Sequence, residues 1–235
     1  MLPNSIGVII PARNEAEEIL GCLATIDVAI NLLHRRFPQV RVQVYVVADG
    51  CTDTTVQRVR AQQRTGTRVR LLVTDEHNVG KARALGVHQY LTDTAKHHPQ
   101  LEHTWIAATD ADSRVPPHWL VAQLQQAMNG VDCVVGTVEP REDTASERVV
   151  RAWFSRHTLG EDHPHIFGAN LGVRGSWYAR VGGFRPLTTG EDVALVEVLR
   201  AHGARVVATD TARVATSARL IGRVSDGFST YCRRL

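Results

Sequence analysis

Short apolar runs alternate with amphipathic segments through the first half of the chain. The runs at residues 7–10, 42–47, 69–73 and 105–108 are typical of buried strands. After the first run, apolar residues recur every three or four positions, which places them on one face of a helix: Ile19, Leu23, Ile26, Ile30, Leu33 and Phe37. Another helix is expected over residues 81–91. This alternation predicts an α/β fold with a mostly parallel central sheet flanked by helices.

The second half of the chain is less regular but still alternates. Strands are expected over residues 133–138, 168–173 and 205–208, and helices are expected over residues 146–156, 176–181 and 192–202. Repeats, low-complexity tracts and a clear linker are absent from the sequence. We therefore predict one domain over residues 1–235, which is an ordinary size for a single core.

Composition and charge narrow the classes of function. With 27 basic and 24 acidic residues, the net charge of +3 is too balanced to predict nucleic-acid binding. The four cysteines, at positions 22, 51, 133 and 232, form no Cys-x-x-Cys pair, which argues against a zinc site or a disulfide framework. A charged leader and a long apolar run are also missing, so we expect a cytoplasmic protein without a transmembrane span. Peripheral contact between the basic tail at residues 220–235 and the inner membrane surface stays open, as does a role of that tail as a lid.

Two acidic residues, Asp110 and Asp112, follow the fourth apolar run directly. Open α/β sheets bind ligands beyond the carboxyl ends of their strands. Carboxylates at such a position suit Mg²⁺ or Mn²⁺ bound to a diphosphate, because hard cations prefer carboxylate and phosphate oxygens. An acidic turn without a ligand is the alternative.

Polar segments also follow the earlier strands, at residues 11–15 and 48–53, and another precedes a helix at residues 78–83. Since parallel strands end at the same edge, these loops should share one rim with the acidic pair. Neither Gly-x-Gly-x-x-Gly after the first strand nor a Gly-x-x-x-x-Gly-Lys-Ser/Thr loop is present, which argues against a dinucleotide site and a phosphate loop.

Taken in order, these motifs resemble those of family 2 glycosyltransferases with the GT-A fold, which is Rossmann-like. The resemblance covers roughly residues 6–219. It rests on Pro-Ala-Arg-Asn-Glu, Asp-Gly-Cys-Thr-Asp, Gly-Lys-Ala-Arg-Ala, Asp-Ala-Asp, Gly-Ala-Asn-Leu-Gly-Val-Arg, Val-Gly-Gly-Phe, Gly-Glu-Asp-Val-Ala-Leu and Thr-Ser-Ala-Arg. It implies a nucleotide-sugar-binding half over residues 1–115 and an acceptor-binding half over residues 116–235.

The resemblance implies a donor site at the strand ends. Asp49 would accept a hydrogen bond from the nucleobase, Asp110 would contact the ribose, and Asp112 would bind the divalent cation, Mn²⁺ or Mg²⁺. Lys81 and Arg83 would face the diphosphate, where cations and a helix N-terminus suit anions. The rest of the donor site would be Pro11, Arg13 and Ala111. A turn, a helix cap or an exposed first helical turn is the structural alternative for each.

A base is needed to take the proton of the acceptor hydroxyl. Two Gly-Glu-Asp triplets compete for this role, at residues 160–162 and 190–192. Only the second follows Val-Gly-Gly-Phe and precedes an amphipathic helix, so we assign Asp192 as the base and Glu191 as the residue that orients it or contacts the acceptor. A helix cap is the structural alternative for Asp192. The first triplet is expected to be a loop.

The acceptor side of the cleft would be formed by Gly168, Ala169 and Asn170, a segment that could equally be a plain buried strand. Trp153 and Trp177 could stack on an acceptor, although such residues usually belong to a core. His163 and His165 do not show the three-ligand pattern of a metal site and suggest a surface loop.

Two departures from the family pattern are visible. Residues 208–219 contain no histidine, although some relatives place a metal ligand there, and the Gln-x-x-Arg-Trp signature of processive synthases is missing. The expected activity is single transfer from a nucleotide-sugar, a UDP-sugar, with inversion, to a small-molecule or lipid-linked hydroxyl. A sugar-nucleotide nucleotidyltransferase and a catalytically inactive nucleotide-sugar-binding protein are the alternatives.

Overall fold

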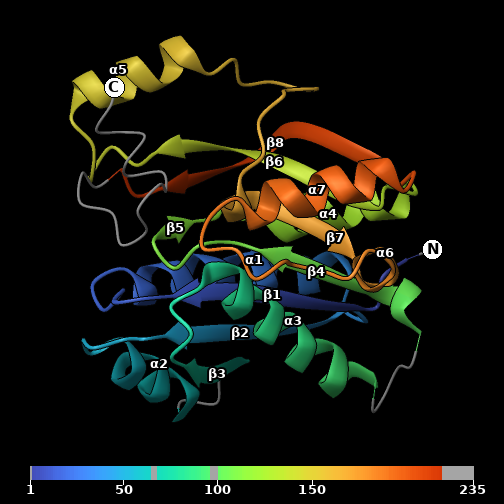
Figure 1. Ribbon diagram of the computed structural model, residues 1–235, viewed down its shortest axis with the longest axis horizontal. Coiled ribbons are helices and arrows are strands. Elements are labelled where there is room, and N and C mark those ends of the chain that lie inside the picture. Colours follow the sequence, from blue (N-terminus) through green and yellow to red (C-terminus); the bar gives the residue numbers. More distant parts are fainter. Residues whose placement is uncertain (1, 65–67, 96–99, 219–235) are drawn as a thin grey trace.

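The computed structural model describes residues 2–64, 68–95 and 100–218 and shows helices on both sides of a central sheet (Figure 1). The strands are β1 (Ser5–Ala12), β2 (Arg41–Asp49), β3 (Val69–Thr74), β4 (Thr104–Ala108), β5 (Ser113–Arg114), β6 (Cys133–Pro140), β7 (Leu171–Arg174) and β8 (Val206–Thr216). The α-helices are α1 (Ile19–Arg36), α2 (Thr55–Arg64), α3 (Val79–Ala95), α4 (Trp119–Met128), α5 (Glu147–Arg156), α6 (Gly175–Arg180) and α7 (Glu191–Ala201). Two short 3₁₀ helices, η1 (Leu101–His103) and η2 (Gly168–Asn170), precede β4 and β7.

All the described strands belong to one eight-stranded sheet with the order β3-β2-β1-β4-β7-β6-β8-β5. Its first four strands are parallel. Strand β7 then runs antiparallel to both β4 and β6, β8 is parallel to β6, and the short β5 is antiparallel to β8. The sheet is therefore mostly parallel, as predicted, and the second half of the sequence completes the sheet that the first half begins.

The two faces of the sheet are covered by different helices. Side chains alternate along a strand, so Val8 and Ile10 of β1 belong to one apolar cluster and Ile9 belongs to another. Helices α1 and α4 supply residues to the first cluster, and α3, α6 and α7 supply residues to the second. Helix α5 lies at one edge of the molecule (Figure 1), and its Trp153 belongs to the first cluster. This two-sided burial explains why the inner strands are apolar on both faces.

Element boundaries differ from the sequence prediction mainly in the second half. The strand expected at residues 168–173 starts only at Leu171, because residues 168–170 form the 3₁₀ turn η2. Strand β8 extends through residue 216, well beyond the expected residues 205–208. Across residues 2–64, 68–95 and 100–218, no helix combines the length and apolar character that crossing a bilayer requires. The tail at residues 220–235 and Cys232 lie outside the described residues.

Asn170 is a core residue, which contradicts its predicted contact with an acceptor. Its side chain is 2% exposed and lies so close to Gly136 that any side chain there would collide with it. The Asn170 Nδ2 donates to the carbonyl oxygens of Thr137 and Ala212, both at 2.9 Å, and its Oδ1 accepts from Trp119 Nε1 at 2.9 Å. The amide thus ties β6, β8 and α4 to the turn before β7.

Asn170→Ala should therefore lower the free energy of unfolding by about 3 kcal/mol, because it leaves two carbonyls and an indole N–H buried without partners. Urea unfolding followed by circular dichroism measures this change. Asn31→Ala, which removes an exposed side chain of α1, is the matched control and should cost less than about 0.5 kcal/mol. A loss below about 1 kcal/mol for Asn170→Ala would contradict the structural role.

Candidate active site

A cavity of about 640 Å³ opens at the carboxyl ends of β1, β2 and β4, where parallel α/β sheets bind ligands. Most residues that the sequence predicted for the site line this one cavity: Pro11, Arg13, Asp49, Arg83, Asp110, Ala111, Asp112, Gly168, Ala169, Glu191 and Asp192. The acidic pair after β4 and the start of α7 are therefore parts of a single cleft, although about 80 residues separate them in sequence.

Arg83 joins the two sides of this cleft. Its guanidinium is 2% exposed and binds three partners. Nε donates to Glu191 Oε1 at 2.9 Å, Nη1 donates to the carbonyl oxygen of Gly168 at 2.9 Å, and Nη2 donates to Asp110 Oδ1 at 2.6 Å. Its predicted contact with a diphosphate gives way to this role, because the guanidinium is committed to protein groups on three sides.

The charge of Arg83 is stabilised by its surroundings. Burial alone would lower the pKa of the guanidinium, but Asp110, Glu191 and Asp192 more than offset this and raise its pKa. Burial raises the pKa of the Glu191 carboxyl, and Arg83 opposes that rise. Since an unpaired buried charge is strongly destabilising, each member of this group depends on the others.

Asp49 organises the loop before α3. Its carboxylate accepts from the backbone N–H groups of Glu76 at 2.7 Å, His77 at 2.9 Å and Asn78 at 2.7 Å. Asp49 also lines the cavity, so its predicted contact with a nucleobase stays a proposal. The ordered loop places the N-terminus of α3, the positive end of the helix dipole, beside the cleft.

The same loop holds the segment that leads to α7. Asn78 Nδ2 donates to the carbonyl oxygen of Pro186 at 3.1 Å, and the Gly80 N–H donates to that of Leu187 at 3.0 Å. A Cβ on Gly80 would lie 2.0 Å from the carbonyl oxygen of Arg185, so only glycine permits this approach. The position of α7 is thereby tied to the ends of β2 and β3.

Lys81 does not line the cavity, so its predicted place at the diphosphate stays a prediction. Its Nζ pairs with Glu76 Oε2 at 2.6 Å, and both side chains are about half exposed. The sequence motif could not show that Arg83 lines the cavity and Lys81 does not, because both residues are basic and both belong to the first turns of one helix. Two residues apart on a helix, their side chains point in different directions.

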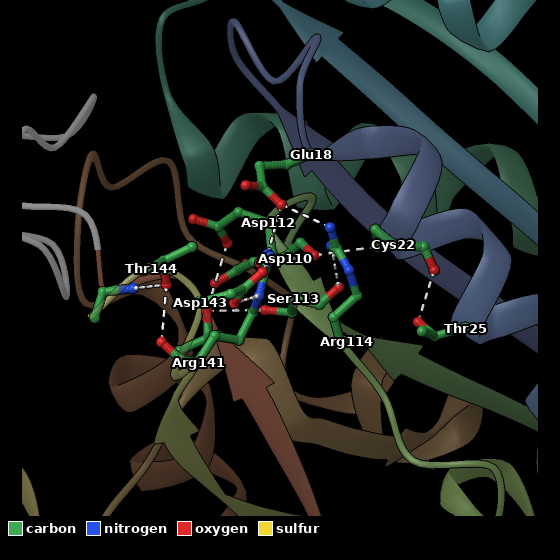
Figure 2. Close-up of polar contacts among 12 residues, drawn as sticks. Glu18, Cys22, Thr25, Asp110, Asp112, Ser113, Arg114, Arg141, Asp143 and Thr144 are labelled. Carbon is green, nitrogen blue, oxygen red and sulfur yellow. Dashed lines mark hydrogen bonds and ion pairs between the residues drawn. The ribbon is translucent and has the colours of Figure 1, made fainter. Parts of the chain in front are cut away.

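Asp112 is supported by a polar network that the sequence did not reveal (Figure 2). Thr216 Oγ1 lies 3.4 Å from Asp112 Oδ1, and Arg141 Nη1 donates to the Asp112 carbonyl oxygen at 3.2 Å. The same Arg141 nitrogen pairs with Glu18 Oε2 at 2.5 Å, and Arg114 Nη2 pairs with that oxygen at 2.7 Å. Burial would raise the pKa of Glu18, but the two arginines more than offset this and lower it.

The residues around Asp112 fit a cation that is shared with a ligand. Among the residues that the structure describes, no three His, Cys, Asp or Glu side chains gather closely enough to hold a metal by themselves. Mg²⁺ and similar ions often use one or two carboxylates and complete their shell with phosphate oxygens and water. One carboxylate in an open cavity, as Asp112 provides, suits that mode of binding.

Asp192 occupies the first turn of α7, not the cap. The helix is preceded by Gly190, whose φ of 74° is left-handed and favours glycine, and it begins at Glu191. Asp192 Oδ1 accepts from the Val193 N–H at 2.8 Å. A Cβ on Gly168 would lie 3.1 Å from Asp192 Oδ2 and 2.6 Å from Arg83 Nη2, so a small residue at position 168 leaves room beside the carboxylate.

Comparison with known proteins identifies the family of this chain. The family described as glycosyl transferase family 2 matches residues 7–180, which is well over half of the chain. The chain belongs to this family. A search of curated proteins found no match to this chain.

Solved GT-A glycosyltransferases have the same fold as this family 2 chain. GalNAc-T7, solved with UDP, GalNAc and Mn²⁺, has a TM-score of 0.66 at 14% identity, over 98% of this chain and 47% of that one. The mannosyltransferase PcManGT of Pyrobaculum calidifontis, solved with GDP-Man and Mn²⁺, has a TM-score of 0.63 at 20% identity, over 98% and 60%. Glucosyl-3-phosphoglycerate synthase of Mycobacterium tuberculosis, solved with Mn²⁺, UDP and phosphoglyceric acid, has a TM-score of 0.58 at 15% identity, over 98% and 75%. The chain thus spans about half to three-fifths of the first two proteins.

The first Gly-Glu-Asp triplet of this family 2 chain is a loop, as predicted. Glu161 Oε1 accepts from Thr209 Oγ1 and from the Asp210 N–H, both at 3.0 Å, and therefore fastens the loop to β8. Neither Glu161 nor Asp162 lines the cavity. Of the two triplets, residues 190–192 are the ones in the cleft.

The Arg83 group can be tested with a double-mutant cycle. Arg83→Gln alone should lower the free energy of unfolding by about 3–5 kcal/mol, because it leaves buried carboxylates without their positively charged partner. Adding Glu191→Gln should then cost less than it does in the wild type, with a coupling energy of at least about 1 kcal/mol. Urea unfolding of the four proteins gives this value. Additivity within about 0.5 kcal/mol would show that the two residues are not coupled.

Proposed function

We propose that this domain is an inverting, metal-dependent glycosyltransferase that moves a sugar from a nucleotide-sugar, a UDP-sugar, to the hydroxyl of an acceptor. The observation that carries the proposal is that Asp112 and Asp192 line one cavity. Family membership supports the class of reaction. The solved structures with UDP or GDP-Man and Mn²⁺ support the type of donor and the need for a divalent cation.

The donor nucleotide would bind at the ends of β1 and β2. Pro11, Arg13 and Asp49 line the cavity there. The side chain of Asp110 is 38% exposed despite its pair with Arg83, which leaves it accessible to a ribose. The start of α3 lies on the same side and favours the negative charge of a diphosphate.

A cation held by Asp112 would neutralise the charge that develops on the departing nucleoside diphosphate. Arg141 contacts the carbonyl of Asp112 and Thr216 contacts its carboxylate, and both contacts help to keep Asp112 in place. These contacts fix the position of the ligand residue before the donor arrives, which lowers the cost of binding.

Asp192 would act as the general base. The acceptor oxygen forms a bond to the anomeric carbon while its proton passes to the Asp192 carboxylate. The bond from the anomeric carbon to the diphosphate oxygen breaks at the same time, and nucleoside diphosphate leaves. One displacement of this kind inverts the anomeric carbon. Arg83 binds both the Gly168 carbonyl and Glu191, the residue that precedes the base, so Glu191 orients the site in this proposal.

The products distinguish this proposal from its two alternatives. Incubation with Mn²⁺ and a panel of nucleotide-sugars should release nucleoside diphosphate. A nucleotidyltransferase would release pyrophosphate, and an inactive binding protein would release neither product. The cytoplasmic location and a lipid-linked acceptor stay predictions of the sequence.

Asp112→Ala should weaken Mn²⁺-dependent binding of UDP by at least about tenfold, which equals about 1.4 kcal/mol, because the cation loses its protein ligand. Isothermal titration with and without Mn²⁺ measures the effect. Asp27→Ala removes an exposed carboxylate of α1 and should leave binding unchanged. If Asp112→Ala retained the full Mn²⁺ effect, the ligand would lie elsewhere.

Asp192→Asn should lower kcat by about 10²–10⁴-fold while UDP binding stays within twofold, because the amide cannot take the acceptor proton. Steady-state release of nucleoside diphosphate and titration of UDP give the two values. Glu197→Gln, an exposed position on the same helix, is the control and should keep wild-type turnover. Near-normal turnover of Asp192→Asn would assign the base to another residue.

A further inference from the structure

The cavity has an aromatic wall next to the proposed base. Trp153 at the end of α5, His157 just after it, and Ile166 and Phe167 before η2 all line the cavity; we call these four residues the acceptor wall. We propose that the acceptor wall binds the ring of a neutral sugar, so that the acceptor is an uncharged glycoside and not a phosphorylated acid. This inference rests on the proposed function and names the class of its acceptor.

The rings of the acceptor wall are packed into one unit. Trp153 and His157 stack with ring centroids 3.5 Å apart and an interplanar angle of 17°. Phe167 lies against both, with centroids 5.9 Å from Trp153 and 6.3 Å from His157. Trp153 is 1% exposed, so it supports the wall from behind, and the half-buried His157 and Phe167 present their surfaces to the cavity. A rigid aromatic surface of this kind loses little entropy when it binds a ligand.

The acceptor wall adjoins the proposed base. Phe167 is followed directly by Gly168, whose carbonyl binds Arg83 and whose Cα faces the Asp192 carboxylate. Val193, which follows Asp192, also lines the cavity and is well exposed. A ring resting on the wall therefore has its hydroxyls within the same corner of the cleft as the base.

The chemistry of the wall suits a sugar ring. A pyranose has an apolar face of C–H groups and a rim of hydroxyls. Aromatic and aliphatic side chains cover such a face, while a few polar groups fix its orientation. Here the apolar surface comes from Ile166, Phe167 and the His157 ring, and the polar groups would be the side chains of Thr188, Thr189 and Asp192, which line the same cavity.

The charges on this side of the cleft disfavour an anionic acceptor. Among the described residues, the arginines and lysines that line the cavity are Arg13, at the donor end, and Arg83, whose guanidinium is buried among carboxylates. Proteins bind phosphate through arginine or lysine, and the acceptor wall contains neither. Glu191 and Asp192 would also repel a second anion. The M. tuberculosis synthase was solved with phosphoglyceric acid, and we infer that this chain differs from it in acceptor class.

His165 packs against the acceptor wall and contacts His157 and Phe167. His165 lies 4.8 Å from His157 and 6.0 Å from His163, measured between ring centroids. Burial, followed by the proximity of His157 and His163, lowers the pKa of His165. His163 is buried and its Nε2 lies 3.2 Å from the Val135 carbonyl oxygen, so the prediction of a surface loop was wrong at this residue.

Ligand-observed saturation-transfer NMR can test the proposal on the full chain with UDP and Mg²⁺. The probes are methyl glycosides of glucose, galactose and mannose, with 3-phosphoglycerate and glucose 6-phosphate as charged competitors. Irradiation of aromatic protons should transfer saturation to ring protons of at least one methyl glycoside and should not do so for 3-phosphoglycerate. The His157→Ala and Phe167→Ala variants should lower this signal at least threefold. The His157→Phe variant, which keeps an aromatic surface, should restore it.

Phe154→Ala is the matched control, because Phe154 lies on α5 beside Trp153, is 43% exposed and does not line the cavity. This variant should keep the full signal. Preferential binding of either charged probe, absence of transfer to every methyl glycoside, or an unchanged signal in His157→Ala would overturn the inference. Titration of UDP on each variant separates these outcomes from failure of the donor site. A wild-type chain that binds no UDP would overturn the proposed function, and the inference with it.

Discussion

The structure of the cleft depends on the buried guanidinium of Arg83. Arg83 projects from α3 into a region where three chain segments meet, and it binds Asp110 after β4, the Gly168 carbonyl of η2 and Glu191 of α7. A buried guanidinium is stable only when its donors are paired with good geometry. The same requirement fixes the relative positions of the two sides of the cleft, because a partner that moved away would leave a donor of the buried guanidinium unpaired. Arg83 therefore holds three chain segments together in one site.

A second arginine, Arg141, contacts the other member of the acidic pair, Asp112. Arg141, at the end of β6, binds Glu18 before α1, Asp143 in the next turn and the carbonyl of Asp112. The turn continues through Thr144, whose Oγ1 donates to the Arg141 carbonyl and accepts from the Ala218 N–H. Figure 2 shows this network around Asp110 and Asp112. Arg83 therefore holds the side chain of Asp110, and Arg141 holds the backbone of Asp112.

Local patterns made the first half of the fold and much of the site predictable. The alternation of apolar runs and amphipathic helices fixes the parallel strands, and strand ends collect the polar loops at one edge. Long-range pairing could not be predicted in this way. Glu18 and Arg141 are 123 positions apart, and neither carries a motif. Asn170 follows Gly168 in the same motif, yet the 3₁₀ turn directs its amide into the core while Gly168 stays at the cavity. Motif membership therefore identified the right segments, and only packing could separate the side chains that face the cleft from those that support it.

The charge of the cleft gives a physical reason for metal dependence that does not rest on resemblance. Six carboxyl residues line the cavity: Glu15, Asp49, Asp110, Asp112, Glu191 and Asp192. Among residues 2–64, 68–95 and 100–218, the arginines that line it are Arg13 and Arg83, and Arg83 already pairs with two of the acids. A nucleoside diphosphate that enters such a cleft adds negative charge to a region that is already negative, and in a partly desolvated site that repulsion is costly. Lys81 does not line the cavity, and its side chain pairs with Glu76. A divalent cation held by Asp112 would supply the missing positive charge and would neutralise the charge that develops on the departing diphosphate.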